Sequence, residues 1–117
     1  MKRIQLIEIA HAKSGDKGNS ANIAVIARNP KYYAILEKYV TEIVVKDHFK
    51  DVCDGAVIRY ALPKIFSLNF ILENALGGGG TSSLRLDALG KALGDALLMM
   101  YIDVPKEVFE IESYSRN

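Results

Sequence analysis

Ala21-Asn22-Ile23-Ala24-Val25-Ile26-Ala27 is the stretch that decides the fold, because small and β-branched residues follow one another almost without interruption. Such a run predicts a central strand that is buried on both faces of a sheet. Asn22 is the polar exception, near the start of the run. An earlier apolar run, Ile4–Ala10, has polar residues at Gln5 and Glu8 and predicts a strand with one face mainly buried.

The residues between these two runs are almost all small, polar or charged: His11-Ala12-Lys13-Ser14-Gly15-Asp16-Lys17-Gly18-Asn19-Ser20. Two neighbouring strands need a connection of only about two to five residues. The longer stretch therefore predicts a loop, and loops held by rigid strands carry much of the chemistry of proteins. We expect residues 11–20 to form much of any functional site.

Two helices and a third strand are predicted after the central strand. Asn29 and Pro30 predict a helix start, because Asn is a good N-cap and Pro fits the first helical turn. Thr41 opens a second predicted helix, Glu42–Phe49. Ala56–Leu62 predicts a third strand, which the following proline ends.

The residues Ile65–Leu76 are compatible with two structures. Apolar side chains at helical spacing, followed by glycines, favour a helix, whereas Phe70-Ile71-Leu72 would also suit a buried strand. Of the two, we predict the helix.

The last predicted helix starts at Asp87, which can cap it, and runs to about Met100. Gly90 and Gly94 lie on one face of this helix, where the missing side chains let another backbone come close. Val104–Ile111 predicts a final strand near an edge, because it contains a proline.

This order of elements predicts one α+β domain over residues 1–117. We expect a two-layer sandwich, with a mainly antiparallel four-stranded sheet and helices on one face. A ferredoxin-like arrangement is the nearest common architecture. Because such a sheet leaves a face to cover, we also expect a homo-oligomer.

The composition narrows the classes of partner and compartment. The chain has 117 residues, a net charge of +1 and one cysteine, Cys53. A balanced charge without a basic, aromatic-rich run argues against nucleic acid as a partner. No apolar stretch is long enough for a bilayer, so we expect no membrane partner and a cytoplasmic location. Two distant histidines and one cysteine lack metal-ligand spacing, so no metal and no cofactor is predicted.

The stretch 11–20 contains residue types that suit an anion. Glycines permit a turn whose successive backbone N–H groups bind an anion, and lysines add positive charge. The pattern is not that of a P-loop, and a solvated turn is the alternative. The candidate ligand-binding residues here are Lys13, Ser14, Gly15, Gly18, Asn19 and Asn22. The candidates for proton transfer or charge stabilisation are His11, Asp16 and Lys17.

A second glycine-rich stretch, Gly77-Gly78-Gly79-Gly80, offers unhindered backbone N–H groups again. Four successive glycines cost considerable backbone entropy, so a function is plausible, although a flexible connection between helices is the alternative. The candidate ligand-binding residues from this half of the chain are Asn69, Gly78, Gly79, Gly80, Arg85 and Lys91.

Several uncommon strings in one order resemble a known family. They are residues 11–19, Asn22-Ile23, Ser67-Leu68-Asn69-Phe70, Ala75-Leu76-Gly77-Gly78-Gly79, and residues 83–87 with Gly90-Lys91. Together they are similar to the C-terminal domain of the acyclic terpene utilisation protein AtuA, over nearly the whole chain. The family pattern usually has Arg where this chain has Lys13, and Lys would weaken a bidentate anion contact.

The resemblance implies a ferredoxin-like fold and a place in the bacterial breakdown of branched terpenoid acids carried as coenzyme A thioesters. The domain often follows a larger N-terminal domain, so the resemblance implies a partner chain of that kind. Three hypotheses follow. The chain is an accessory domain that binds an anionic or acyl-CoA ligand with its two glycine-rich loops, a free-standing lyase or hydratase, or a structural oligomerisation domain.

Overall fold

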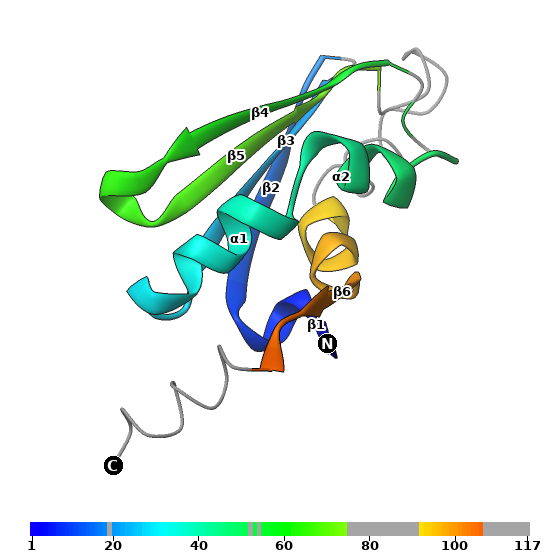
Figure 1. Cartoon of the computed structure of the whole chain (residues 1–117). Coiled ribbons are helices and arrows are strands. Elements are labelled where there is room, and N and C mark those ends of the chain that lie inside the picture. Colours follow the sequence, from blue (N-terminus) through cyan, green and yellow to red (C-terminus); the bar gives the residue numbers. More distant parts are fainter. Residues whose placement is uncertain (19, 52, 54, 75–91, 107–117) are drawn as a thin grey trace.

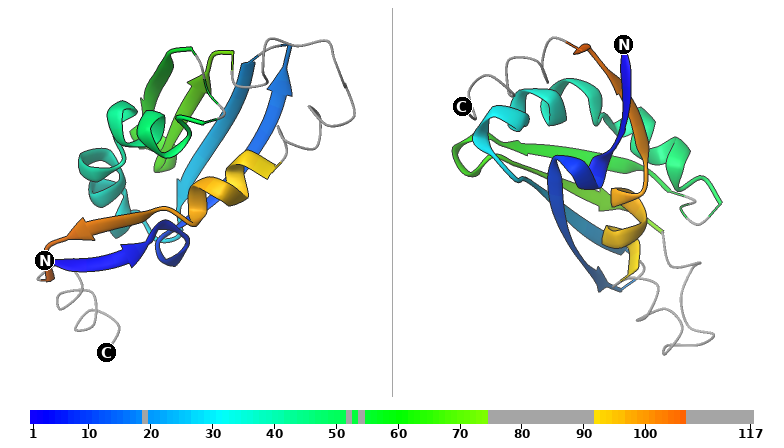
Figure 2. Two further views of the ribbon diagram at one scale, coloured as in Figure 1. Left: turned by 90° about the vertical axis from the view of Figure 1, so that its right-hand side faces the viewer. Right: turned by 90° about the horizontal axis from the view of Figure 1, so that it is seen from below.

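The computed structural model describes residues 1–18, 20–51, 53, 55–74 and 92–106, and of Asp16 and Lys17 only the backbone. The larger sheet has four strands. Figure 1 shows it behind a layer that contains helices α1 and α2. The left view of Figure 2 shows that these helices lie on one side of the sheet. The predicted α+β class and the four-stranded antiparallel sheet with helices on one face are therefore confirmed.

The four-stranded sheet has the order β2-β3-β5-β4, with every neighbouring pair antiparallel. Its strands are β2 (Ala10–Lys17), β3 (Ser20–Ala27), β5 (Ser67–Leu72) and β4 (Val57–Leu62). The run that predicts a central strand is β3, which lies between β2 and β5. The prediction that β3 is buried on both faces is wrong, because burial alternates along it and Asn22 is exposed.

A second sheet pairs β1 (Lys2–Gln5) with β6 (Tyr101–Val104). The predicted strand Ile4–Ala10 is therefore wrong, since a helical turn of residues 6–8 divides it. The Gln5 N–H donates to the Glu8 carboxylate at 2.7 Å and stabilises that turn. The predicted strand Val104–Ile111 is also misplaced: β6 ends at Val104, and residues 107–111 lie outside the described part.

Both predicted helix starts after β3 are confirmed. Asn29 caps a short helical turn, Pro30–Tyr32, which continues into α1 (Tyr33–Tyr39). Thr41 caps α2 (Glu42–His48). Each capping side chain accepts a backbone N–H from the first turn, at 3.0 Å and 3.3 Å respectively.

The predicted helix over Ile65–Leu76 is wrong, because Ser67–Leu72 is strand β5. Leu68, Phe70 and Leu72 are fully buried and are spaced by two, which is the period of a strand. A neighbouring strand on each side supplies the backbone hydrogen bonds that a helix would have made internally.

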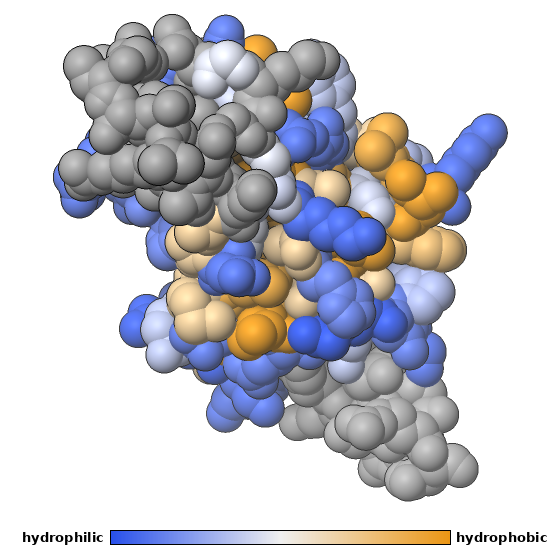
Figure 3. Space-filling model, turned by 180° about the vertical axis from the view of Figure 1, so that it is seen from behind, coloured by the Kyte–Doolittle hydropathy of each residue, from blue (hydrophilic) through white to orange (hydrophobic). Residues whose placement is uncertain are grey.

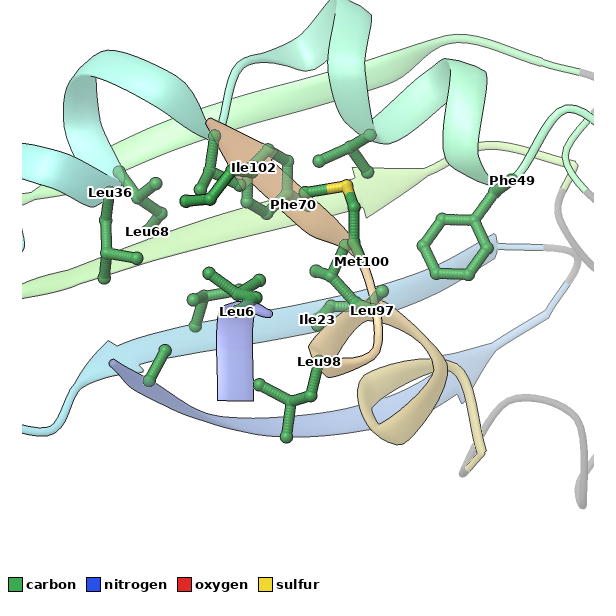
Figure 4. Packing of buried hydrophobic residues seen from close by; sticks show 14 of the residues in the cluster. Leu6, Ile23, Leu36, Phe49, Leu68, Phe70, Leu97, Leu98, Met100 and Ile102 are labelled. Carbon is green, nitrogen blue, oxygen red and sulfur yellow. The ribbon is translucent and has the colours of Figure 1, made fainter. Parts of the chain in front are cut away.

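The hydrophobic core lies between the four-stranded sheet and the elements in front of it. Figure 4 shows side chains from the sheet and the covering layer meeting there. Leu6, Leu36, Phe70 and Leu97 are each fully buried, although they come from four different parts of the chain. Core packing therefore fixes the sheet relative to the covering layer.

Residues 92–98 form the described part of the helix predicted from Asp87 to Met100. Gly94 packs directly on β2: a Cβ atom added to Gly94 would lie 2.9 Å from the Ser14 Oγ and 3.4 Å from the Ser14 N. The Gly94 N–H donates to the same Oγ at 2.8 Å. The close backbone approach predicted for Gly94 is confirmed, whereas Gly90 lies outside the described residues.

Candidate functional site

Residues 11–17 are not the loop that the sequence predicts; they belong to β2 and pair with β3. The pairing continues to Lys17 and Ser20, and only Gly18 and Asn19 lie between the strands. Gly18 has a φ of 65°, which suits glycine at a tight turn. β2 pairs with β3 on one side only, and successive N–H groups of a strand point to opposite sides, so residues 11–17 do not form the expected series of converging N–H groups. The Gly18-Asn19 dipeptide was the sequence signal for a two-residue hairpin.

Alternate residues of the four strands point away from the helices and form what we call the outer face. Antiparallel partners share a face, so the register places strand positions in rows that cross the sheet. One row contains Lys13, Ala24, Asn69 and Tyr60, and the next contains Gly15, Asn22, Ile71 and Ile58. The remaining described positions of the outer face are His11, Ser20, Ile26, Ser67 and Leu62.

The outer face brings together five of the predicted site residues, from three strands. They are His11, Lys13, Gly15, Asn22 and Asn69. Asn22 and Asn69 are 47 positions apart in sequence, yet the Asn22 Nδ2 donates to the Asn69 Oδ1 at 3.0 Å. A Cβ atom added to Gly15 would meet no described residue within 4 Å, so the described part of the sheet leaves space for a ligand beside Asn22.

Ser14 does not belong to this group, because its side chain contacts Gly94 on the helix side of the sheet. Gly18 is exposed at the hairpin turn. Asp16 and Lys17 are placed by their backbone alone, opposite Ala21 and Ser20. The other predicted site residues lie outside the described part of the chain: Asn19, Gly78, Gly79, Gly80, Arg85 and Lys91.

The outer face is polar on the β2 side and largely apolar on the β4 side. β2 contributes His11 and Lys13, while β4 contributes Ile58, Tyr60 and Leu62. None of the residues in the two rows of the outer face described above carries a carboxylate. Figure 3, seen from behind Figure 1, shows hydrophobic and hydrophilic residues interspersed on this side, without one continuous apolar surface. The arrangement suits a ligand with an anionic end and an apolar end.

Arg59, the charged residue of β4, serves a different purpose. It lies opposite Phe70 on the helix side of the sheet. Its Nη1 donates to the backbone carbonyls of Glu37 and Val40, at 2.8 Å and 2.9 Å. These carbonyls belong to the C-terminal end of α1, so the guanidinium stabilises that helix end rather than the outer face.

His11 has no arrangement for general acid–base catalysis among the described residues. Its side chain is exposed and makes no hydrogen bond to any described residue. An activated histidine is usually oriented by a third group, such as a carboxylate.

The described residues contain no cluster of three side chains that could hold a metal ion. In the same part of the chain, no helix has the length and apolarity needed to cross a membrane.

The residues that sequence reasoning missed are the apolar members of the outer face. Ile58, Tyr60 and Ile71 lie in the same rows as the predicted polar residues. Their signal was the alternation of β4 and β5, in which every second side chain must leave the core. It was hidden for Ile71 because its segment was predicted to be helical.

Comparison with known proteins identifies a family. The model of the AtuA ferredoxin-like domain family matches residues 4–103. The matched residues include the whole four-stranded sheet and the described helices, together with parts of β1 and β6. No curated protein and no solved structure matches the chain.

Proposed function

The chain belongs to the AtuA ferredoxin-like domain family, and from this premise we propose that it is an accessory domain in the catabolism of branched terpenoid acids. In this proposal it binds an anionic or acyl-CoA ligand and works beside a larger AtuA-type N-terminal chain. The ligand lies on the outer face of the sheet. The proposed pathway and partner rest on the family resemblance, and the proposed binding of a ligand rests on the residues of the outer face.

The proposal rests on the order in which charged, polar and apolar side chains follow one another across the sheet. Lys13 offers a cation on β2, and Gly15 leaves space beside it. The Asn22–Asn69 pair follows on the two central strands, and Ile71 and Ile58 complete the row on β5 and β4. An acyl thioester of coenzyme A presents the same order: phosphates, a polar arm and an apolar acyl chain.

The second glycine-rich segment is included in the proposal because of the described residues on either side of it. Asn74 follows the end of β5, whose last residue, Leu72, pairs with Ala21 at the start of β3. Gly94, beyond the segment, contacts Ser14 on β2. The first flank thus adjoins the end of the sheet where β2 turns into β3, and the second lies against the middle of β2 on the helix side. We include Gly78, Gly79, Gly80, Arg85 and Lys91 in the proposed site on this ground.

The binding part of the proposal is tested by calorimetric titration of the full chain with coenzyme A and a short acyl-CoA. We expect Lys13→Gln to weaken binding roughly tenfold, which is about the contribution of one charge-assisted hydrogen bond. Lys46→Gln is the control, because Lys46 is an exposed lysine on α2, away from the outer face. The absence of binding by either compound, or an equal loss in both variants, would contradict the proposal.

The partner part of the proposal is tested by mixing the chain with a separately expressed AtuA-type N-terminal chain. We expect the two to elute together in size-exclusion chromatography. Separate elution at every concentration and with acyl-CoA present would contradict a stable partnership.

Self-association is also part of the proposal. Of the eight exposed large hydrophobic residues among those described, four lie on the hairpin formed by β4 and β5: Tyr60, Leu62, Ile65 and Phe66. A second copy that covers them would remove this apolar surface from water. We expect a dimer or larger species in light scattering, and Ile65→Ser to weaken it. A wild-type monomer at high concentration would contradict this part.

A further inference from the structure

The Asn22–Asn69 pair is an unusual choice for the centre of a sheet. Both residues lie in the interiors of the two central strands, where asparagine is intrinsically disfavoured. Asn22 is exposed and Asn69 is half-buried, so neither amide is needed to satisfy a fully buried group. Packing alone would be served better by β-branched residues at these positions, such as those at Ile26 and Ile71. The pair therefore points to recognition of something outside the chain.

Within the described part of the chain, the pair leaves one amide group without a partner at each end. The Asn22 Nδ2 and the Asn69 Oδ1 are joined at 3.0 Å. The Asn22 Oδ1 remains as an acceptor and the Asn69 Nδ2 as a donor. If both amides were turned over, the free groups would be a donor on Asn22 and an acceptor on Asn69. In either orientation the pair offers both donors and acceptors, because the bonded NH2 group also keeps its second N–H and the bonded oxygen its second lone pair.

This combination discriminates between classes of ligand. A carboxylate or phosphate carries acceptors at neutral pH and cannot satisfy the free acceptor of the pair. An amide-bearing arm supplies an N–H for the acceptor and a C=O for the donor. Because an unpaired polar group costs free energy when a ligand covers it, the pair favours an amide-bearing arm over an alkyl chain.

The residues around the pair indicate where the other parts of such a ligand would lie. Lys13 lies opposite Ala24, one row away from Asn22, so its backbone is about 7–8 Å from Asn22 across the diagonal. An anionic group beside Lys13 would thus continue into an arm that crosses the pair. Ile71 and Ile58 then receive an apolar end.

We propose that the Asn22–Asn69 pair recognises the amide groups of a phosphopantetheine-type arm, so that the domain takes its acid as a thioester on that arm and not as the free acid. The proposal rests on the ligand-binding function proposed above and assigns the pair as its specificity-determining element. Lys13 holds the anion in both cases, whereas the asparagines distinguish the carrier.

The test compares two probes that differ in the amides. S-octanoyl-4′-phosphopantetheine carries a phosphate, two amides and an acyl chain, while decyl phosphate carries a phosphate and an alkyl chain without amides. Calorimetric titration measures both with the wild-type chain and with the Asn22→Thr, Asn69→Thr double variant. Thr suits a strand, so we expect this variant to fold, and its thermal unfolding midpoint verifies that. Ser20→Thr, on the same face of β3, is the matched control.

We expect the wild-type chain to prefer the amide-bearing probe by roughly tenfold, the value of a net pair of hydrogen bonds. The double variant should lose this preference while its affinity for decyl phosphate stays unchanged, and Ser20→Thr should keep the preference. Equal wild-type affinity for both probes, or a preference that survives in the double variant, would overturn the inference. Neither result would contradict the proposed anion site at Lys13. Failure of the wild-type chain to bind either probe would remove the proposed function itself, and the inference with it.

Discussion

The two faces of the four-stranded sheet are built from the same strands, yet they differ in almost every property. On β5, Leu68, Phe70 and Leu72 are fully buried against the helix layer, whereas the intervening Asn69 and Ile71 remain half-exposed. The helix side is constrained by packing, so its residues must fit a dense core. The outer face lacks that constraint among the described elements, which leaves it free to carry polar residues for binding. Substitutions on the two faces should therefore differ in their effects on stability and on binding.

The largest contrast is expected between adjacent residues of β5. Phe70→Ala should lower the free energy of unfolding by about 3–5 kcal/mol, because it removes a fully buried ring from the centre of the core. Ile71→Ala, one residue later on the outer face, should cost clearly less. Chemical denaturation measures both variants, and similar losses would show that the outer face is packed against something.

The second contrast compares two glycines. An added Cβ at Gly55 would lie 2.5 Å from the backbone carbonyl oxygen of Glu73, which the adjoining ladder holds in place. Gly55→Ala should therefore cost about 1–3 kcal/mol. Gly15→Ala meets none of the described residues within 4 Å and replaces a glycine within a strand, so it should leave stability unchanged or raise it slightly. Thermal unfolding of both variants decides the point, and a destabilised Gly15→Ala would mean that this surface is occupied.

The third contrast uses neighbours on β2 that point to opposite faces. Ser14→Ala removes the oxygen that accepts the Gly94 N–H, and this should cost about 1 kcal/mol or somewhat more. Lys13→Ala, on the outer face, should leave the free energy of unfolding nearly unchanged while weakening ligand binding. Urea titration separates the two. The prediction is wrong if Lys13→Ala destabilises the chain as strongly as Ser14→Ala.

The smallest effect is expected at high pH. Burial of Tyr33 on α1 raises the pKa of its phenol, and the nearby Glu37 carboxylate raises it further. Stability from the neutral phenol is present below the ordinary tyrosine pKa of about 10 and is lost as pH rises through the higher folded-state pKa. Tyr33→Phe should make the loss of stability above that pH less steep, whereas Tyr60→Phe on the outer face should not. Unfolding midpoints measured across this range would contradict the assignment if the two variants behaved alike.

Much of the fold was predictable from the sequence, because several elements carry a local signal. The β3 run is strand-like by composition, and the helix starts at Asn29 and Thr41 follow from capping chemistry. The wrong predictions share a physical cause. Residues 11–17 look like a loop by composition, and residues 67–72 carry helical as well as strand spacing. In both segments, hydrogen bonds to β3 outweigh the local preference.

The candidate site was predicted in part. Its residue types could be listed from sequence because lysine, histidine, glycine and asparagine lie close together in residues 11–22. Their arrangement could not, since a loop and a strand place alternate side chains in different directions. Ser14 shows the consequence: its position in the sequence groups it with Lys13, whereas the strand turns its side chain to the opposite side of the sheet.

The sequence by itself determined that the chain forms an α+β fold around the β3 strand, because hydrophobic runs, caps and turn residues act over a few neighbouring positions. It also supplied the polar residues from which a site is made. Only the tertiary structure decided that β2 and β5 flank β3, and that Asn22 meets Asn69 on the open side of the sheet. The reason is that strand pairing is a long-range interaction: its hydrogen bonds and register depend on a partner distant in sequence, and they settle which side of the sheet each residue faces.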